Sequence, residues 1–109
     1  MQEDFELETV LSITTGINFA NDYGDVLDLY SFILEDDFIS EENLLMLHDT
    51  VKRHILAIHP ELNYVRFNPN IDIDKWLSVQ KSIFGQTLTI SVLGEKVVKL
   101  EKQSYVSLR

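Results

Sequence analysis

Apolar residues recur at helical spacing over residues 40–59, and this pattern constrains the fold more than any other feature of the sequence. The intervals of 3, 4, 4 and 3 place the apolar positions on one face of a helix. They are Leu44, Leu47, Val51, Ile55 and Ile58. Ser40 is a suitable N-cap, and Pro60 ends the helix because the residue before a proline is pushed out of the helical region. We therefore predict an amphipathic helix with one buried face.

Three shorter helices are predicted from apolar spacing combined with local start and stop signals. They run over residues 4–15 with Gly16 as the stop, from a turn at 21–24 to the acidic run at 35–37, and from Asp72 to just before Gly85. Aspartates in a first helical turn complement the helix dipole, and a glycine suits the left-handed position beyond the last turn. Helical elements thus fill most of the chain up to residue 85.

The residue pattern becomes typical of β-structure near the end of the chain. The segments TLTISVL and KVVKLEKQSYVSL flank Gly94 and Glu95, and their valines, isoleucines, threonines and tyrosine favour strands. We predict an antiparallel hairpin here, and a short strand over the alternating residues 63–68. The expected fold class is α+β, with three to four helices followed by a small antiparallel sheet in a single compact domain over residues 1–109.

The absence of cysteine from all 109 residues excludes disulfides and thiolate metal ligands. The first ten residues, MQEDFELETV, are acidic where a signal peptide is basic and then apolar. No stretch approaches the roughly 18–20 apolar residues that span a bilayer. We expect a cytoplasmic protein without a membrane partner.

The acidic charge is confined largely to the first half of the chain. Residues 1–51 hold thirteen carboxylates and no Lys or Arg, whereas residues 52–109 hold five carboxylates and all nine bases. The two parts therefore carry −13 and +4. Such segregation repels nucleic acids and membrane surfaces and attracts basic protein surfaces. The charge alone leaves open whether this surface binds a partner or only keeps the protein soluble.

No residue pattern in the chain predicts catalysis, a metal site or a cofactor. His48 and His59 share a helix face, but eleven residues of helix place them roughly 16 Å apart, too far for one metal ion. The segment DYGDVLD lacks the ligand order of a calcium loop, and GEKVVK is not a phosphate-binding loop. The nine bases are scattered, so direct nucleic-acid binding is disfavoured. We expect a non-enzymatic protein.

Four segments of the chain form a recognisable series: LSITTG at 11–16, YGDVLDLYSFILEDDFI at 23–39, HPEL at 59–62 and KWLSVQKSIFGQTLTISVL at 75–93. Together they resemble an uncharacterised family of small bacteriophage and prophage proteins. The resemblance covers most of residues 10–93, and the terminal KVVKLEKQSYVSLR departs from it. It implies a phage origin and no catalytic residues. Small acidic phage proteins of this kind occupy basic surfaces on host proteins, including the nucleic-acid channels of defence enzymes.

Three functional hypotheses follow, and the first is an acidic inhibitor of a host defence system, such as a CRISPR nuclease. Its partner-binding carboxylates would be Asp22, Asp25, Asp28, Glu35, Asp36, Asp37, Glu41 and Glu42. The second hypothesis is an assembly accessory protein that forms a homo-oligomer through the edge of the C-terminal hairpin. The third is a sponge for a small signalling molecule, which requires Lys and Arg to converge because an acidic protein is otherwise a poor host for anions.

Overall fold

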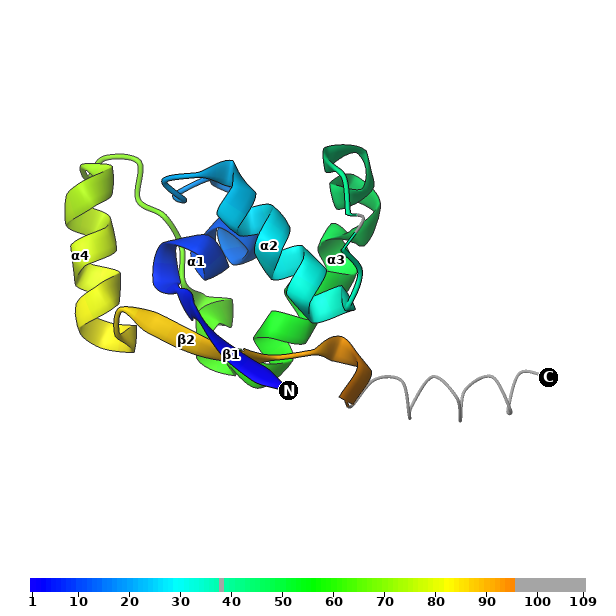
Figure 1. Ribbon diagram of the computed structural model, residues 1–109. Helices are drawn as coiled ribbons and strands as arrows, with labels where there is room; N and C mark the ends of the chain where they lie inside the picture. The colour runs from blue at the N-terminus through cyan, green and yellow to red at the C-terminus, as the bar shows by residue number, and fades with distance from the viewer. Residues whose placement is uncertain (38, 96–109) are drawn as a thin grey trace.

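The computed structural model describes residues 1–37 and 39–95 and shows α-helices packed together with a two-stranded antiparallel sheet (Figure 1). The strands are β1 (Gln2–Glu6) and β2 (Thr87–Ser91), the α-helices are α1 (Leu7–Thr15), α2 (Tyr23–Leu34), α3 (Glu41–Ile58) and α4 (Ile73–Phe84), and the 3₁₀ helices are η1 (Pro60–Tyr64) and η2 (Leu93–Glu95). The predicted α+β class is confirmed.

The sheet joins the two ends of the described chain rather than two neighbouring segments. β2 confirms the first arm of the predicted hairpin, but its partner is β1, with Gln2 opposite Ser91 and Glu6 opposite Thr87. The predicted second arm lies outside the described residues. The predicted helix over residues 4–15 is wrong in its first part, because β1 precedes α1, while its predicted end at Gly16 is confirmed by a left-handed φ of 80°.

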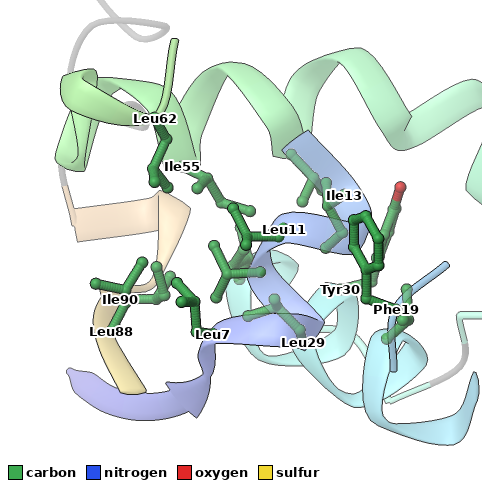
Figure 2. Close-up of a cluster of buried hydrophobic side chains, with 14 of the residues drawn as sticks. Leu7, Leu11, Ile13, Phe19, Leu29, Tyr30, Ile55, Leu62, Leu88 and Ile90 are labelled. Atoms are coloured by element: carbon green, nitrogen blue, oxygen red, sulfur yellow. The ribbon is translucent and has the colours of Figure 1, made fainter. Parts of the chain in front are cut away.

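Helix α1 is the centre of the core. Every residue from Leu7 to Thr14 is buried, and α1 contacts α2, α3, α4 and both strands. Apolar side chains of α2, α3 and β2 lie around Leu7 and Leu11 of α1 (Figure 2). The hydroxyl of Ser12 donates to the Glu8 carbonyl at 2.7 Å and accepts from the Phe19 amide at 2.8 Å. Internal hydrogen bonds of this kind allow polar residues in a helix without a solvent face.

The predicted strand over residues 63–68 is wrong. Pro60 opens a single 3₁₀ turn instead, and residues 65–68 have no regular structure. Local bonds replace a strand ladder: the Asn63 side-chain amide donates to the Pro60 carbonyl, and Arg66 donates to the Asn63 carbonyl. Tyr64 is 87% exposed, so the alternation of polar and apolar residues in this segment does not arise from packing in a sheet.

The three later helices confirm their predicted ends. Asp22 caps α2 by accepting from the Gly24 amide at 2.9 Å, and Asp72 caps α4 by accepting from the Lys75 amide at 3.3 Å. Ser40 takes the N-cap position of α3, although its side chain forms no capping bond. α3 ends at Ile58, two residues before Pro60. These local signals set where each helix begins and ends along the chain, independently of the rest of the fold.

Glu35 ends α2 in a conformation that normally requires glycine. Its φ is +54°, and the Asp36 amide donates to the Ser31 carbonyl, as in a Schellman motif. Glu35→Gly should raise the free energy of unfolding by about 0.5–1 kcal/mol, because the relief of left-handed strain exceeds the added chain entropy of glycine. Urea denaturation measures the change. Asp37→Gly is the control, since it removes a charge without a positive φ, and equal stabilisation by both variants would contradict this cause.

Candidate functional site

The three histidines hold the fold together rather than forming a site with one another. The Nε2 atoms of His48, His54 and His59 lie 3.1, 2.7 and 2.7 Å from main-chain carbonyls of other elements. A carbonyl oxygen can only accept, so each Nε2 carries the hydrogen and cannot ligate a metal ion. No group of three potential metal ligands occurs within residues 1–37 and 39–95.

The phase of hydrogen bonding in the sheet determines which backbone groups point outward. Leu7 N donates to Gln86 O at 2.9 Å, and Val92 N donates to Met1 O at 3.2 Å. Antiparallel pairs alternate between bonded and non-bonded positions. The N–H and C=O groups of residues 2, 4 and 6 therefore point away from β2, and those of residues 87, 89 and 91 point away from β1.

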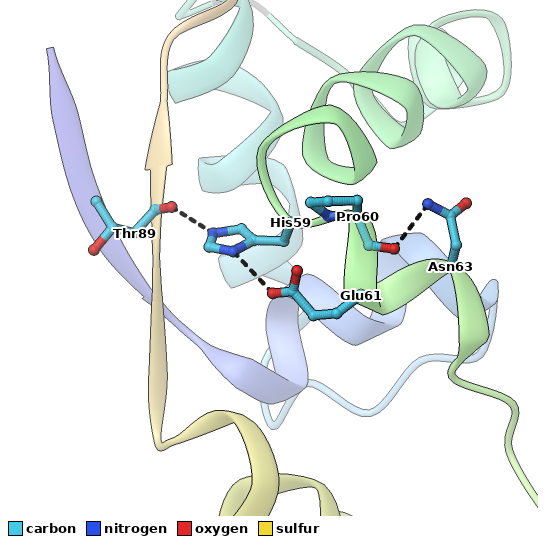
Figure 3. A network of polar contacts seen from close by, with 5 residues as sticks. All are labelled: His59, Pro60, Glu61, Asn63 and Thr89. Atoms are coloured by element: carbon cyan, nitrogen blue, oxygen red, sulfur yellow. Dashed lines mark hydrogen bonds and ion pairs between the residues drawn. The ribbon is translucent and has the colours of Figure 1, made fainter.

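The outer edge of β2 is blocked by α3 and the residue that follows it. His54 donates to the Ser91 carbonyl, and His59 donates to the Thr89 carbonyl (Figure 3). The Nδ1 atom of His59 lies 3.4 Å from a carboxylate oxygen of Glu61. Two of the three outward carbonyls of β2 are thus occupied, and a further strand cannot use them.

The outer edge of β1 has no neighbouring strand in the described structure. Gln2, Asp4 and Glu6, whose backbone groups point outward, are all exposed. The Asp4 carboxylate accepts from the Thr89 hydroxyl at 2.5 Å, across a non-bonded pair of the sheet. Phe5 faces the core and packs on Phe32 of α2, with ring centroids 5.2 Å apart. The sheet therefore has one blocked edge and one open edge.

A hollow of about 210 Å³ lies beside this open edge, and we call it the acidic hollow. Five carboxylates and no base line it, together with Phe5 and Thr9. The carboxylates are Glu3, Asp4 and Glu6 from β1 and Asp25 and Asp28 from α2. Carboxylates gathered in this way produce a negative potential that attracts a basic group. An open strand edge and this potential coincide at one place on the molecule.

The eight carboxylates proposed from the sequence do not share one location. Asp25 and Asp28 line the acidic hollow, whereas Asp22 caps the start of α2. Glu35, Asp36 and Asp37 are exposed beyond the far end of α2, about 15 Å along the helix from Asp25. The remaining pair, Glu41 and Glu42, occupies the first turn of α3. Only two of the eight therefore contribute to the acidic hollow.

Sequence reasoning missed Glu3, Asp4 and Glu6 as candidate site residues because it assigned Asp4 and Glu6 to a helix and Glu3 to no element. A usable signal was present, since MQEDFELE holds four carboxylates and no base within eight residues. What the residues alone did not show is that this segment pairs with β2 and lies beside the first turns of α2.

A second hollow, of about 430 Å³, lies between α2 and the start of α3. Tyr23, Tyr30, Leu45 and His48 are among its lining residues, and Glu41 lies at the same hollow. Burial raises the pKa of the Tyr30 hydroxyl to about 12, and the neighbouring Tyr23 adds to the shift. Tyr30 therefore stays neutral at physiological pH and provides no base.

Comparison with protein-family models, curated proteins and solved structures finds no match. No helix in the described part of the chain is both long enough and apolar enough to cross a lipid bilayer.

Proposed function

We propose that this chain is a non-catalytic binding protein that holds a basic, extended segment of a partner protein against the open edge of β1. The observation that carries the proposal is the asymmetry of the sheet. His54 and His59 block the edge of β2, whereas the edge of β1 stays open beside five carboxylates. Strand addition of this kind draws its affinity from main-chain hydrogen bonds and its specificity from neighbouring side chains.

Charge favours a basic partner over a second copy of the chain. Pairing of two β1 strands would bring Glu3, Asp4 and Glu6 of one copy close to the same residues of the other, and like charges on neighbouring strands are destabilising. A homo-oligomer through the edge of β2 would have to displace His54 and His59. A partner segment carrying Lys or Arg meets neither obstacle.

The resemblance to small phage proteins suggests a host protein as the partner. A bacterial defence nuclease fits the proposal, because the channel that receives nucleic acid is basic, and carboxylates can occupy positions where phosphates would lie. In this version, binding falls steeply as salt rises and competes with nucleic acid. Light scattering tests the alternative of an assembly protein, which requires an oligomer at micromolar concentration.

The proposal is tested with a synthetic peptide of alternating Lys and Val residues, titrated into the full chain by calorimetry. The double reversal Asp25→Lys with Asp28→Lys should weaken binding by about tenfold to a hundredfold, because attraction becomes repulsion beside the peptide. The control is Asp37→Lys with Glu42→Lys, which changes the net charge equally but away from the acidic hollow. Equal losses in both variants would show that only net charge matters.

A second pair of variants tests the main-chain contact itself. Glu6 has a φ of −59°, which suits proline, and its amide points away from β2. Glu6→Pro removes this donor together with the charge, whereas Glu6→Gln removes the charge alone. We expect the proline variant to bind the peptide several-fold more weakly than the glutamine variant. Equal affinities would contradict strand addition at β1.

A further inference from the structure

We infer that the chain also has a binding site for a small organic anion, in a hollow of about 450 Å³ beside α3. This volume is within the range of small-molecule sites. The end of α1, the second half of α3 and the segment that follows η1 form its walls. Lys52 and Arg66 line it, and no carboxylate does, so we call it the cationic hollow.

Lys52 is the first of the two cations. It lies on α3 and is half-buried, and its ammonium group forms no ion pair or hydrogen bond with the described residues. Asp49 and Glu61 are the carboxylates nearest to Lys52 along the chain. Asp49 lies 3.6 Å from the imidazole of His48, and Glu61 lies 3.4 Å from that of His59. An unpaired lysine in the wall of a hollow is suited to receive an anionic group.

Arg66 is held in place by the backbone around it. Its Nη1 atom donates to the carbonyl oxygens of Asn63 at 2.7 Å and of Val65 at 2.9 Å. A guanidinium group has five N–H donors, so three remain on Nε and Nη2. These remaining donors have no partner among the described residues and can bind a carboxylate or a phosphate.

Five of the other eight lining residues are apolar, and three are polar, namely Thr14, Thr15 and Asn63. The apolar residues are Ile17, Leu56, Leu62, Val65 and Phe67, and the hydroxyl of Thr15 is already bonded to the Leu11 carbonyl at 2.6 Å. An inorganic ion would leave this apolar surface uncovered. The lining therefore fits an anionic group attached to an aromatic ring or a short aliphatic body, which buries apolar area while its charge meets Lys52 and Arg66.

The net charge of −9 does not prevent such binding. Solvent-exposed charges farther apart than about 8 Å are largely screened at physiological ionic strength, whereas direct contacts with a lysine and an arginine are not. The condition that the sequence set for a small-molecule function, convergence of Lys and Arg, is met by Lys52 and Arg66. The inference is independent of the proposed binding at β1, because the two hollows share no residue.

The test is a fluorescence titration of the full chain with anilinonaphthalene sulfonate, an aromatic anion of suitable chemistry. Lys52→Gln and Arg66→Gln should each weaken binding by about tenfold, because each removes one charge-assisted contact. Lys75→Gln is the matched control, since Lys75 is an exposed lysine of α4 outside the hollow. Unchanged affinity in Lys52→Gln, or an equal loss in Lys75→Gln, would overturn the inference.

Two further measurements separate the loss of an anion contact from the loss of structure, and identify the class of anion. N-phenylnaphthylamine, which lacks the sulfonate, should bind Lys52→Gln as well as the unaltered chain, and this shows that the hollow stays folded. If Arg66→Gln disturbs the structure of the segment after η1, the affinity of Lys52→Gln for the dye is the deciding measurement. Phenylacetate and phenyl phosphate, each at millimolar concentration, are then tested as competitors of the dye. Displacement by phenylacetate indicates a carboxylate ligand, and displacement by phenyl phosphate indicates a phosphate ligand. Displacement by neither would count against an anion site.

Discussion

Trp76→Ala is expected to lower the free energy of unfolding by about 3–5 kcal/mol, the range for truncating a large buried aromatic side chain. Trp76 is 4% exposed and stacks on Phe19, with ring centroids 5.0 Å apart and planes at 24°. Phe67 meets it edge-on, with centroids 5.2 Å apart. Because these rings connect α4 to the loops before α2 and after η1, their loss leaves a cavity and weakens the attachment of α4.

Circular dichroism in urea is the appropriate measurement, because Trp76 is the sole tryptophan and its removal abolishes the fluorescence signal. Val79→Ala is the control on the same helix, since Val79 is 53% exposed. Its effect should stay within about 0.5 kcal/mol. A loss below 1 kcal/mol in Trp76→Ala would mean that α4 contributes little to the cooperative fold.

Lys81→Met is expected to cost roughly 2–3 kcal/mol. The Lys81 ammonium lies 2.8 Å from a carboxylate oxygen of Glu8, whose side chain is 11% exposed. Substitution by methionine keeps the length of the side chain and leaves a nearly buried carboxylate without its counter-charge. The estimate lies below the range for fully buried pairs because the Lys81 side chain is 27% exposed.

Glu8→Gln in the Lys81→Met background should restore most of the lost stability, because it removes the unpaired charge instead of leaving it buried. Lys75→Met controls for the loss of a lysine from α4, and Lys75 is exposed. If the double variant is as unstable as Lys81→Met alone, packing around Lys81 rather than the charge of Glu8 is responsible. The free energies of unfolding of the unaltered chain, Glu8→Gln, Lys81→Met and the double variant, measured in urea, form a double-mutant cycle.

These two contacts bear on function through α1. Glu8 lies in the first turn of α1, two residues after the end of β1, and Lys81 ties that turn to α4. The same turn contains Thr9, which lines the acidic hollow. A variant that releases α4 should therefore also disturb the open edge of β1, whereas variants in the acidic hollow should leave stability nearly unchanged.

Helices α2, α3 and α4 and most of their ends could be predicted from local sequence signals. Their signals are local. Asp22 and Asp72 cap the starts of α2 and α4, Pro60 follows α3, and the apolar residues of each buried face recur at helical spacing. Gly16 marked the end of α1 for the same reason. Signals of this kind act within one or two turns, so they need no knowledge of the rest of the chain.

The sheet, and hence the candidate site, depends on contacts between segments that are far apart in sequence. β1 and β2 are joined by contacts such as that between Asp4 and Thr89, which are 85 residues apart in sequence. An isolated strand is not stable, so Gln2–Glu6 becomes a strand only because β2 and α1 cover it. A local reading of Asp4–Thr15 therefore predicted one continuous helix.

The charged surface likewise depends partly on the sequence and partly on tertiary contacts. The excess of carboxylates in residues 1–51 is a property of the sequence, but only the packing of β1 beside α2 brings five of them together at an open strand edge. Likewise, the basic residues look scattered along the chain, yet Lys52 and Arg66 line one hollow. Composition determines how much charge a chain carries, whereas contacts between distant segments determine where that charge can act.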